Sequence, residues 1–395
     1  MAERITQAIV LAAGEGQRLK PFTTLMPKVM LPIAGKPILQ YVIEALAENG
    51  IRRIILVVGY RKEQVQDYFE SGQNYGVEIE YVLQPQQLGV GHAIKQVKDY
   101  ADERFLVAMG DNIIDPDTIE PLALMDSDAL LVKPLEDSSR YKAVIVNDHF
   151  VSDIVVPPSE QASGLVDIGI YNFGRELFNF MGQEVRLTPM IRNMIASGHR
   201  ILAMSTDGFW QDAVYPWDLI KLNDSRLSEI EPSIGGTIEE SVSIKDPVVV
   251  GNGTIIRSNC YIVGPVSIGE NCEIGPNVCI FPSTSIGNGV LVSPFTILRN
   301  DSIGNNVSIG PCSNINNSIV AAGTNIGSHF GARSSDCHVR IENEYYATEM
   351  GAIIGNYCRI GDNTIIEPGV IVGNNCSIDP LKLIGKNLPD NCQVI

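Results

Sequence analysis

The sequence predicts an α/β domain with a mostly parallel sheet, followed by a parallel β-helix. Two patterns in the 395 residues support this prediction. The first part of the chain alternates apolar, strand-like runs with helix-like stretches, which is typical of a parallel sheet flanked by helices. The second part repeats an aliphatic residue every six positions, which is neither a helix period nor a hairpin spacing. At about 150 residues per domain, the length suits two or three domains.

The strand-like runs of the first part are short and apolar. They are residues 8–11, 54–58, 79–83, 105–109 and 129–132. Helix-like stretches at 38–49 and 62–69 separate several of them, and 217–230 is expected to be a helix that leads out of the domain.

The six-residue repeat runs through most of the second part. Nine aliphatic residues keep one phase: Val250, Ile256, Ile262, Ile268, Ile274, Ile280, Ile286, Val292 and Leu298. The phase slips by one residue before Ile303 and again before Val320, and it returns from Ile354 to Ile384. Three hexapeptides form one triangular coil with the aliphatic residues inside, so about seven coils are expected. The stretch 328–353 breaks the repeat and is expected to project as a loop. The predicted parts are a domain over 1–230, a linker over 231–247 and a solenoid over 248–395.

Charge and composition exclude several classes of function. Lys and Arg total 29 and Asp and Glu total 46, which gives a formal net charge of −17. Such an acidic chain is a poor general binder of nucleic acid or anionic membranes. The sequence contains no apolar run of ~18 residues, so no transmembrane helix is predicted. The N-terminal segment is typical of a buried strand rather than a signal peptide. The eight cysteines include no C-x-x-C pair, so we expect reduced core residues of a cytosolic protein.

A glycine-rich, locally basic loop follows the first strand-like run. The pair Gly14 and Gly16 lacks the third glycine of the dinucleotide fingerprint, and no Walker A motif is present. Glycines after a strand still allow backbone N–H groups to approach phosphate. Between Gly14 and Lys36 the sequence contains four cationic residues and one acidic residue, Glu15, which gives a local net charge of +3. The cationic residues are Arg18, Lys20, Lys28 and Lys36.

This loop resembles the signature of nucleotide-sugar pyrophosphorylases, L-A-A-G-x-G-x-R-x-x-P-x-T followed by P-K and P-I-x-G-K-P. The chain matches it at residues 11–18, at Pro21 and Thr23, at 27–28 and at 32–37. With the hexapeptide repeat behind it, nearly the whole chain resembles archaeal-type bifunctional N-acetylglucosamine-1-phosphate uridylyltransferase/glucosamine-1-phosphate acetyltransferases. The resemblance implies a Rossmann-like nucleotidyltransferase domain followed by a left-handed parallel β-helix.

The resemblance also implies the reaction. In this family a sugar 1-phosphate attacks the α-phosphate of a nucleoside triphosphate in line, and pyrophosphate leaves. Such chemistry depends on positioning and charge neutralisation. The implied nucleotide-binding residues of the loop are Leu11, Ala12, Ala13, Gly14 and Gly16. Arg18 is implied to grip the leaving phosphates, and Lys28 to neutralise charge around the α-phosphate in the transition state.

Residues 84–93 resemble the uridylyltransferase pattern Q-x-x-x-L-G-T-G-H-A, with Val90 in place of the usual Thr. The resemblance implies that Gln84 and Gly89 contact the pyrimidine of UTP or dTTP. We expect His92 to be structural rather than catalytic.

Two aspartates are candidate Mg²⁺ ligands. Asp111 follows the strand-like run at 105–109, and a carboxylate at the end of a strand suits Mg²⁺ beside bound phosphates. Asp212 lies in a stretch that resembles the family's W-x-D-[VTI]-G-[TR]-P-x-D and takes the second ligand position, although Val214 replaces the glycine.

The sugar pocket departs most from the family pattern. Lys142 follows Tyr141 where the family has Gly, and residues 156–158 (VPP) stand where the family has E-K-P with a phosphate-contacting Lys. Asp167 replaces the sugar-contacting Asn in a stretch that keeps Gly169. Lys142, Asp167 and Gly169 are therefore the candidate sugar-binding residues, and an altered sugar, a shifted pocket and a weakened enzyme all stay open.

The solenoid leaves a second activity open. Related bifunctional enzymes acetylate an amino sugar there with a His base in an H-x-x-Y element, which the matching stretch 312–318 lacks. His329 and His338 in the interrupting stretch are candidate acyl-transfer residues, with acetyl-CoA as a further partner. The resemblance also implies a homotrimer or a dimer of trimers. Two alternatives remain: a low-activity regulatory or scaffolding paralogue, and an oligomerising acyltransferase with a vestigial first domain.

Overall fold

The computed structural model describes residues 5–135, 140–155, 164–182, 185–341 and 344–395. The chain forms two compact units. The first unit comprises Met1–Glu15, Met26–Leu31 and Pro37–Asp212. The second unit comprises Gly16–Leu25, Pro32–Lys36 and Ala213–Ile395.

The first unit contains a sheet with nine strands among the described residues, in the order β5-β4-β1-β6-β11-β8-β12-β10-β9. Four neighbours run parallel: β5 (Glu78–Leu83), β4 (Arg53–Val58), β1 (Gln7–Ala12) and β6 (Arg104–Met109). Next to β6, β11 (Gly164–Gly174) runs antiparallel to it and to β8 (Ala129–Leu135). The sheet is completed by β12 (Leu202–Ser205), β10 (Phe150–Val155) and β9 (Ala143–Asn147). The predicted α/β fold is confirmed, and four strands, β11, β12, β10 and β9, are additions that the sequence patterns did not reveal.

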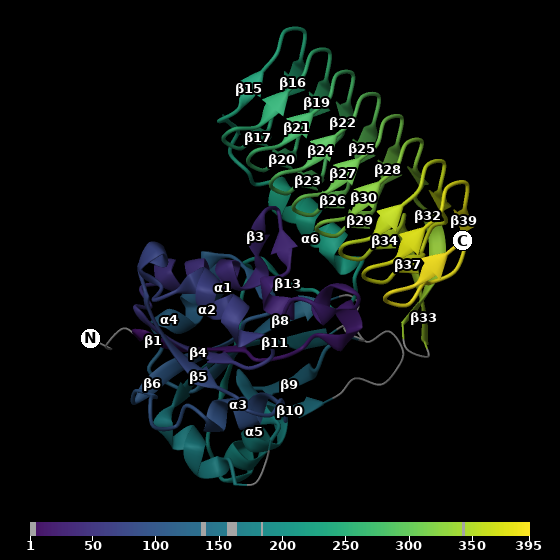
Figure 1. Cartoon of the computed structure of the whole chain (residues 1–395). Coiled ribbons are helices and arrows are strands. Elements are labelled where there is room, and N and C mark those ends of the chain that lie inside the picture. The colour runs from purple at the N-terminus through teal and green to yellow at the C-terminus, as the bar shows by residue number, and fades with distance from the viewer. Residues whose placement is uncertain (1–4, 136–139, 156–163, 183–184, 342–343) are drawn as a thin grey trace. The chain divides into compact units, whose positions relative to one another are not determined.

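Helices cover both faces of this sheet because its strands are apolar on both sides. Along β1, Val10 belongs to one core cluster and its neighbour Ile9 to the other. Helices α1 (Ile38–Glu48), α2 (Lys62–Phe69) and α4 (Pro116–Ala123) pack on the Val10 side, and α3 (Val90–Lys95) and α5 (Leu187–Ala196) pack on the Ile9 side (Figure 1). This layering leaves the carboxyl ends of the parallel strands as the edge where loops can meet a ligand.

The second unit is a β-helix whose three faces are parallel sheets of eight, nine and eight strands within the described ranges (Figure 1). Ile268 pairs with Ile286, which is 18 residues on, and Ile286 pairs with Ile303, which is 17 residues on. The slips of phase in the sequence are therefore coils of 17 residues. The repeated aliphatic side chains form one buried core, which confirms the predicted β-helix.

The β-helix begins before residue 248. Strands β14 (Ser233–Ile234), β15 (Thr237–Ile238) and β16 (Ser243–Lys245) pair in register with the following coil. Ile238 and Ile244 pack against the core and continue the six-residue phase backward from Val250. The segment 231–247, expected as a linker, therefore contains strands of the first coil.

The interruption of the repeat is a β-hairpin and is shorter than the expected loop. Phe330 and Ala332 still point into the solenoid core. The hairpin consists of β32 (Ser335–Ile341) and β33 (Glu344–Met350), which pair antiparallel. Its buried residues Val339 and Met350 lie on one face of the hairpin, in which alternate residues of each strand share a face, so this stretch follows a two-residue and not a six-residue period.

Two further segments belong to the second unit. Helix α6 (Asp218–Leu227), expected at 217–230, is tied to a coil by the Asn223 side chain, whose Nδ2 donates to Ser283 O at 3.0 Å. The loop Gly16–Leu25 is closed by Thr23 Oγ1, which donates to Gly16 O at 2.8 Å. Buried Asn374 in the late coils donates through Nδ2 to Pro21 O at 2.8 Å. This loop is therefore anchored to the solenoid.

All eight cysteines are free, as expected, and four of them are buried in the solenoid. Cys312, by contrast, is exposed. None of the helices in the described ranges combines the length and hydropathy needed to cross a membrane.

Candidate active site

Hydrogen bonds from the segments that follow β4 and β6 hold the end of β1, and Gly14 after it is exposed to solvent. Leu11 O accepts from Gly110 N at 2.9 Å, and Ala13 O accepts from Tyr60 N at 3.2 Å. Leu11, Ala12 and Ala13 are buried, whereas Gly14 is exposed and an added Cβ there would meet no atom within 4 Å. The three buried residues thus place the backbone, and Gly14 has the free space that close approach of a phosphate requires.

The rest of the predicted phosphate loop lies in the second unit. Gly16 has φ +77°, which favours glycine, and starts the short 3-10 helix η1 (Gln17–Leu19). Arg18 lies in η1, is exposed and has no ion-pair partner among the described residues. Its guanidinium is therefore available to a bound anion.

Lys28 and Asp111 form the central ion pair of the first unit. Lys28 lies in the 3-10 helix η3 (Lys28–Met30), and Asp111 follows β6 after Gly110. Lys28 Nζ is 2.6 Å from Asp111 Oδ2, with 13% of the Lys28 and 36% of the Asp111 side chain exposed. The residues predicted to bind the α-phosphate and the metal therefore meet at the carboxyl end of β6.

A two-stranded ladder places Asp212 next to this ion pair. Strand β13 (Trp210–Asp212) runs antiparallel to β7 (Asn112–Ile114), and Asp212 is the partner of Asn112. Directly paired residues of such a ladder have Cα atoms roughly 5 Å apart. Tyr141 Oη donates to Asp212 Oδ1 at 2.8 Å and orients its carboxylate.

The two aspartates suit Mg²⁺ better than a transition metal. Mg²⁺ is commonly bound by one or two carboxylates, with water and substrate phosphates completing the shell. Among the described residues no three or more His, Cys, Asp or Glu side chains group as a complete metal site. Asp111 and Asp212 are therefore a fitting partial ligand set for a metal that arrives with the triphosphate.

Gln84 and Gly89 follow β5 at the same edge of the sheet. Gln84 is only 4% exposed, and its Nε2 donates to Gly89 O at 3.1 Å. Gly89 has φ +121°, and a Cβ there would lie 2.8 Å from Val185 O. This position therefore requires glycine for both conformation and space.

The predicted sugar-binding residues lie beside the metal-binding candidates. Asp167 Oδ1 accepts from Gly169 N at 2.9 Å, and Oδ2 accepts from Tyr171 Oη at 2.8 Å. Burial raises the pKa of the Asp167 carboxyl above its usual value, an effect that these hydrogen bonds and the charge of Lys142 partly oppose. Lys142 is exposed, and its backbone O accepts from Asp167 N at 2.9 Å.

Asn112 connects this region to the metal-binding candidates. Its Nδ2 donates to Ile168 O at 2.9 Å, and a Cβ at Gly169 would lie 2.7 Å from Met109 Cγ. The structure thus brings together Lys28, Asp111, Asp212, Asp167 and Gly169 within the first unit. Sequence reasoning missed the roles of Asn112 and Tyr141, although the tyrosine of the family's Y-G element was a signal for the latter. Residues 156–158, matched to E-K-P, lie outside the described residues.

The solenoid histidines occupy different elements. His329 is an exposed corner residue with φ +55°, ahead of β31 (Gly331–Ala332). His338 is exposed in β32 and is paired with Ala347. The inner face of the hairpin carries Tyr346, whose ring centroid is 4.4 Å from that of Tyr215.

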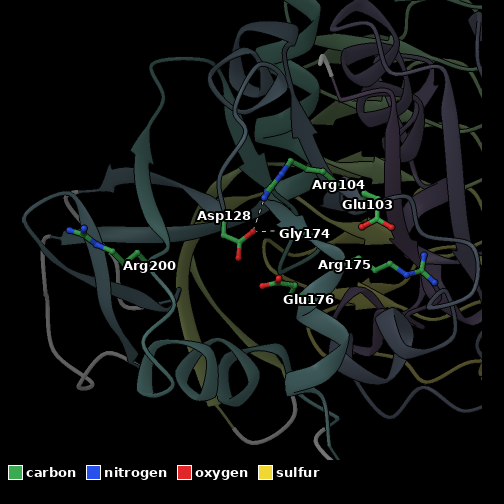
Figure 2. A pocket seen from close by; sticks show the side chains of 7 residues that line it. All are labelled: Glu103, Arg104, Asp128, Gly174, Arg175, Glu176 and Arg200. Atoms are coloured by element: carbon green, nitrogen blue, oxygen red, sulfur yellow. Dashed lines mark hydrogen bonds and ion pairs between the residues drawn. The ribbon is translucent and has the colours of Figure 1, made fainter. Parts of the chain in front are cut away.

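A polar pocket of about 320 Å³ lies at the opposite end of the sheet. It is lined by Glu103, Arg104, Asp128, Gly174, Arg175, Glu176 and Arg200 (Figure 2). Arg104 starts β6, whereas Asp111 follows its other end, and six strand residues span ~20 Å.

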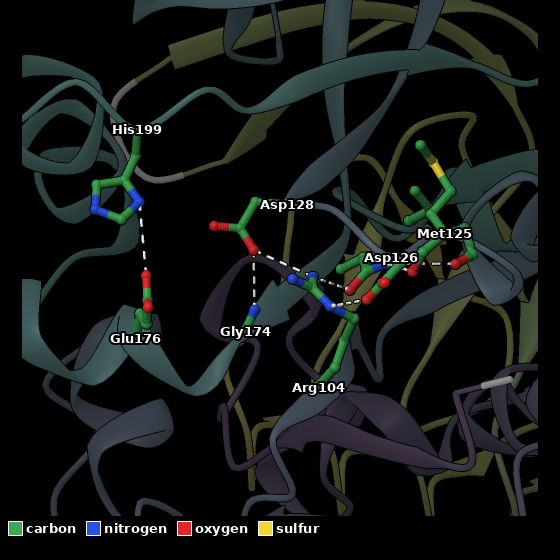
Figure 3. A network of polar contacts seen from close by, with 9 residues as sticks. Arg104, Met125, Asp126, Asp128, Gly174, Glu176 and His199 are labelled. Atoms are coloured by element: carbon green, nitrogen blue, oxygen red, sulfur yellow. Dashed lines mark hydrogen bonds and ion pairs between the residues drawn. The ribbon is translucent and has the colours of Figure 1, made fainter. Parts of the chain in front are cut away.

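Charged side chains of the pocket are paired with one another and with neighbouring residues. Arg104 contacts Asp128 at 3.2 Å and Asp126 at 3.6 Å, while His199 faces Glu176 at 4.0 Å (Figure 3). Three arginines are balanced by three acidic side chains in the lining, so it has no net charge to attract a triphosphate. We therefore assign the pocket to the stability of the strand ends and not to the active site.

Comparisons with known proteins agree with this geometry. The nucleotidyl transferase family model matches residues 7–229. A GMPPB C-terminal domain model matches 256–335, and a bacterial transferase hexapeptide model with six repeats matches 351–386.

Among the relatives of this chain, a bifunctional protein GlmU of Methanocaldococcus jannaschii is 31% identical over 97% of this chain and 96% of its own. A glucose-1-phosphate thymidylyltransferase of Streptomyces antibioticus is 31% identical over 73% of this chain and 84% of its own. A solved UDP-glucose pyrophosphorylase complexed with UDP-glucose covers 57% of this chain and all of its own, with a TM-score of 0.52 and 24% identity, and it supports the fold alone.

Proposed function

Because the chain belongs to the nucleotidyl transferase family and is a nucleotidyltransferase with a hexapeptide-repeat solenoid, we propose that it makes a UDP- or dTDP-sugar from UTP or dTTP and a sugar 1-phosphate. A phosphate oxygen of the sugar 1-phosphate attacks the α-phosphorus. The bond from the α-phosphorus to the bridging oxygen of the β-phosphate breaks, and that oxygen leaves with pyrophosphate.

The observation that carries the proposal is the Lys28–Asp111 pair with Asp212 on the adjoining strand. Lys28 neutralises charge that spreads over the α-phosphate as the new bond forms. Arg18 binds the departing phosphates, and the open backbone at Gly14 admits the triphosphate. Asp111 and Asp212 would hold Mg²⁺, which supplies further charge neutralisation when bound.

The candidate sugar-binding residues are compatible with a sugar 1-phosphate but do not identify a particular sugar. Asp167 and Gly169 offer a carboxylate and a tight backbone turn, and exposed Lys142 is the nearby cation. Lys142 would compensate for the lysine that the family's E-K-P element provides.

A pyrophosphate-release screen tests the proposal. UTP, dTTP, CTP, ATP and GTP are combined with a panel of sugar 1-phosphates in the presence of Mg²⁺, with the Asp111→Ala variant as the inactive control. We expect turnover with UTP or dTTP and at least one sugar. Nucleotide binding without release of pyrophosphate from any pair would instead support the regulatory or scaffolding paralogue.

We propose that the solenoid mainly holds a trimer, or a dimer of trimers, together. One corner and face of it expose large apolar side chains in two groups, which we together call the apolar surface: Phe295 and Ile297, and, beyond the intervening Asn314 and Gly331, Ile365, Leu381 and Leu383. Leu381 is 77% exposed and adopts φ +63°, a left-handed conformation that Asn adopts more often than any other residue type in this solenoid. Exposed apolar residues grouped in this way are typical of an interface between subunits.

Light scattering tests the assembly. Replacing Leu381 and Leu383 by Asp should yield smaller species at micromolar concentration. Leu124→Asp in the first unit is the matched control, because Leu124 is 63% exposed and lies outside the apolar surface. A wild-type monomer would contradict the proposed trimer.

We propose further that acetyl transfer to glucosamine 1-phosphate is absent or weak, because residues 312–318 provide no His or Tyr at the expected positions. A thiol-release assay with acetyl-CoA tests this. Robust turnover that disappears in His329→Ala or His338→Ala would overturn the proposal and identify a relocated base.

A further inference from the structure

The side-chain amide of Gln84 has only one possible orientation. Its Nε2 donates to Gly89 O at 3.1 Å, and the same nitrogen lies 3.0 Å from His92 Nδ1. A backbone carbonyl oxygen only accepts hydrogen bonds, so the nitrogen, and not the oxygen, must face Gly89. The second amide hydrogen then points to His92 Nδ1.

This contact favours one tautomer of His92. Nδ1 must offer a lone pair to the Gln84 amide, and a neutral imidazole carries one proton, so the proton is on Nε2. The Gln96 amide lies 3.2 Å from His92 Nε2. The same Gln96 nitrogen donates to His92 O at 3.3 Å, so the Nε2–H tautomer requires the Gln96 amide to turn its carbonyl oxygen toward Nε2 and lose this longer hydrogen bond, while the 3.1 Å bond from Gln84 Nε2 to Gly89 O is kept.

The packing of α3 holds the imidazole in place. His92 N donates to Val185 O at 3.1 Å. A Cβ at the neighbouring Gly91 would lie 2.4 Å from Met190 Cε and 2.9 Å from Val185 C, so the helix start is seated tightly against Val185. The ring that receives the Gln84 amide therefore comes from a rigid element.

We propose that His92 is a positioning residue that, together with Gly89 O, makes Gln84 present its carbonyl oxygen to the nucleobase. No described residue donates a hydrogen bond to Gln84 Oε1. An acceptor at this place pairs with the N3–H of uracil or thymine, whereas N3 of cytosine is itself an acceptor. His92 thus selects UTP and dTTP against CTP without contacting the base. The inference rests on the proposed function, since it requires a pyrimidine nucleotide at Gln84.

The test compares two substitutions at His92 in the full-length protein. His92→Phe keeps a ring of similar size but offers no acceptor, so Gly89 O alone holds the Gln84 amide in this orientation. His92→Asn restores an acceptor oxygen near the position of Nδ1. The measurement is kcat/KM for UTP and for CTP with a sugar 1-phosphate that the wild-type enzyme uses.

We expect His92→Phe to lower the ratio of the UTP to the CTP value about tenfold to a hundredfold, the usual effect of a mispaired buried polar group. His92→Asn should recover most of the ratio. A merely structural role would lower both values together, and an unchanged ratio in His92→Phe would overturn the inference while leaving the proposed function intact. Failure of the wild-type enzyme to use any pyrimidine nucleotide would instead contradict the proposed function.

A second measurement needs no destabilising variant. Nuclear magnetic resonance of the ¹⁵N-histidine-labelled wild-type protein reports the tautomer, and the signals of His92 are assigned by their loss in His92→Asn. We expect an unprotonated Nδ1 and a protonated Nε2. A protonated Nδ1 would overturn the inference.

Discussion

The substitution Gly14→Ala distinguishes the space available at this position in the free protein from the space that a bound nucleotide requires. Gly14 is exposed, its φ is outside the left-handed region, and an added Cβ would meet no atom within 4 Å. The free chain therefore accepts the methyl group without strain. If the triphosphate approaches this backbone, the same methyl group occupies space that a phosphate needs.

Two opposite effects follow from this geometry. Gly to Ala at a compatible backbone position stabilises a protein by ~0.4–1 kcal/mol, because the unfolded chain loses freedom. For a unit of this size the gain corresponds to a rise in Tm of about 1–4 °C. Crowding an occupied site with one carbon atom costs ~1–3 kcal/mol, so affinity for the triphosphate should fall about fivefold to 150-fold.

Thermal unfolding and calorimetric titration with UTP and Mg²⁺ measure the two effects. Gly174→Ala is the matched control, because Gly174 has φ −79°, a Cβ there would lie 3.4 Å from the nearest atom, Arg104 Nη2, and the site is at the opposite end of the sheet. It should leave affinity unchanged. Wild-type affinity in Gly14→Ala would refute the phosphate position, and a marked loss of stability would refute the absence of strain.

Other perturbations follow from contacts of the site and of the solenoid. Lys28→Ala should lower kcat ~10²–10³-fold, and Asp111→Ala should abolish Mg²⁺-dependent turnover in the pyrophosphate assay; wild-type rates in both would contradict the assigned site. Tyr141→Phe removes the donor on Asp212 Oδ1 and should raise the Mg²⁺ concentration for half-maximal rate ~10–100-fold, whereas a shift in sugar KM alone would argue against a role at the metal. Asp301 is fully buried in the solenoid, and burial raises its carboxyl pKa well above the usual value, so its contribution to stability is greatest below the unfolded-state pKa and is lost as pH rises through the folded-state pKa. Denaturant titrations from pH 4 to 8 should show a pH slope that is shallower in Asp301→Asn by up to ~1.4 kcal/mol per pH unit, and equal slopes would count against an ionisable Asp301.

Most of the fold was predictable because its periods are local. The strand-like run at 54–58 and the helix-like stretch at 62–69 correspond within one residue to β4 and α2. The six-residue phase identified the solenoid and, read backward to Ile238, would also have located its first coil. The hairpin was missed because a two-residue alternation is weak evidence beside a six-residue repeat.

The sequence by itself determined which residue types the site contains, since the glycine-rich loop, Lys28, Asp111 and Asp212 lie in contiguous motifs. Only the tertiary structure decided how they combine. Asp111 and Asp212 are about 100 residues apart in the chain and become neighbours through the β7–β13 ladder. The Tyr141–Asp212 contact and the Gln84–His92 contact likewise depend on atoms placed within ~3 Å of each other. Such contacts arise from strand order and side-chain packing, and a local sequence pattern carries no information about either.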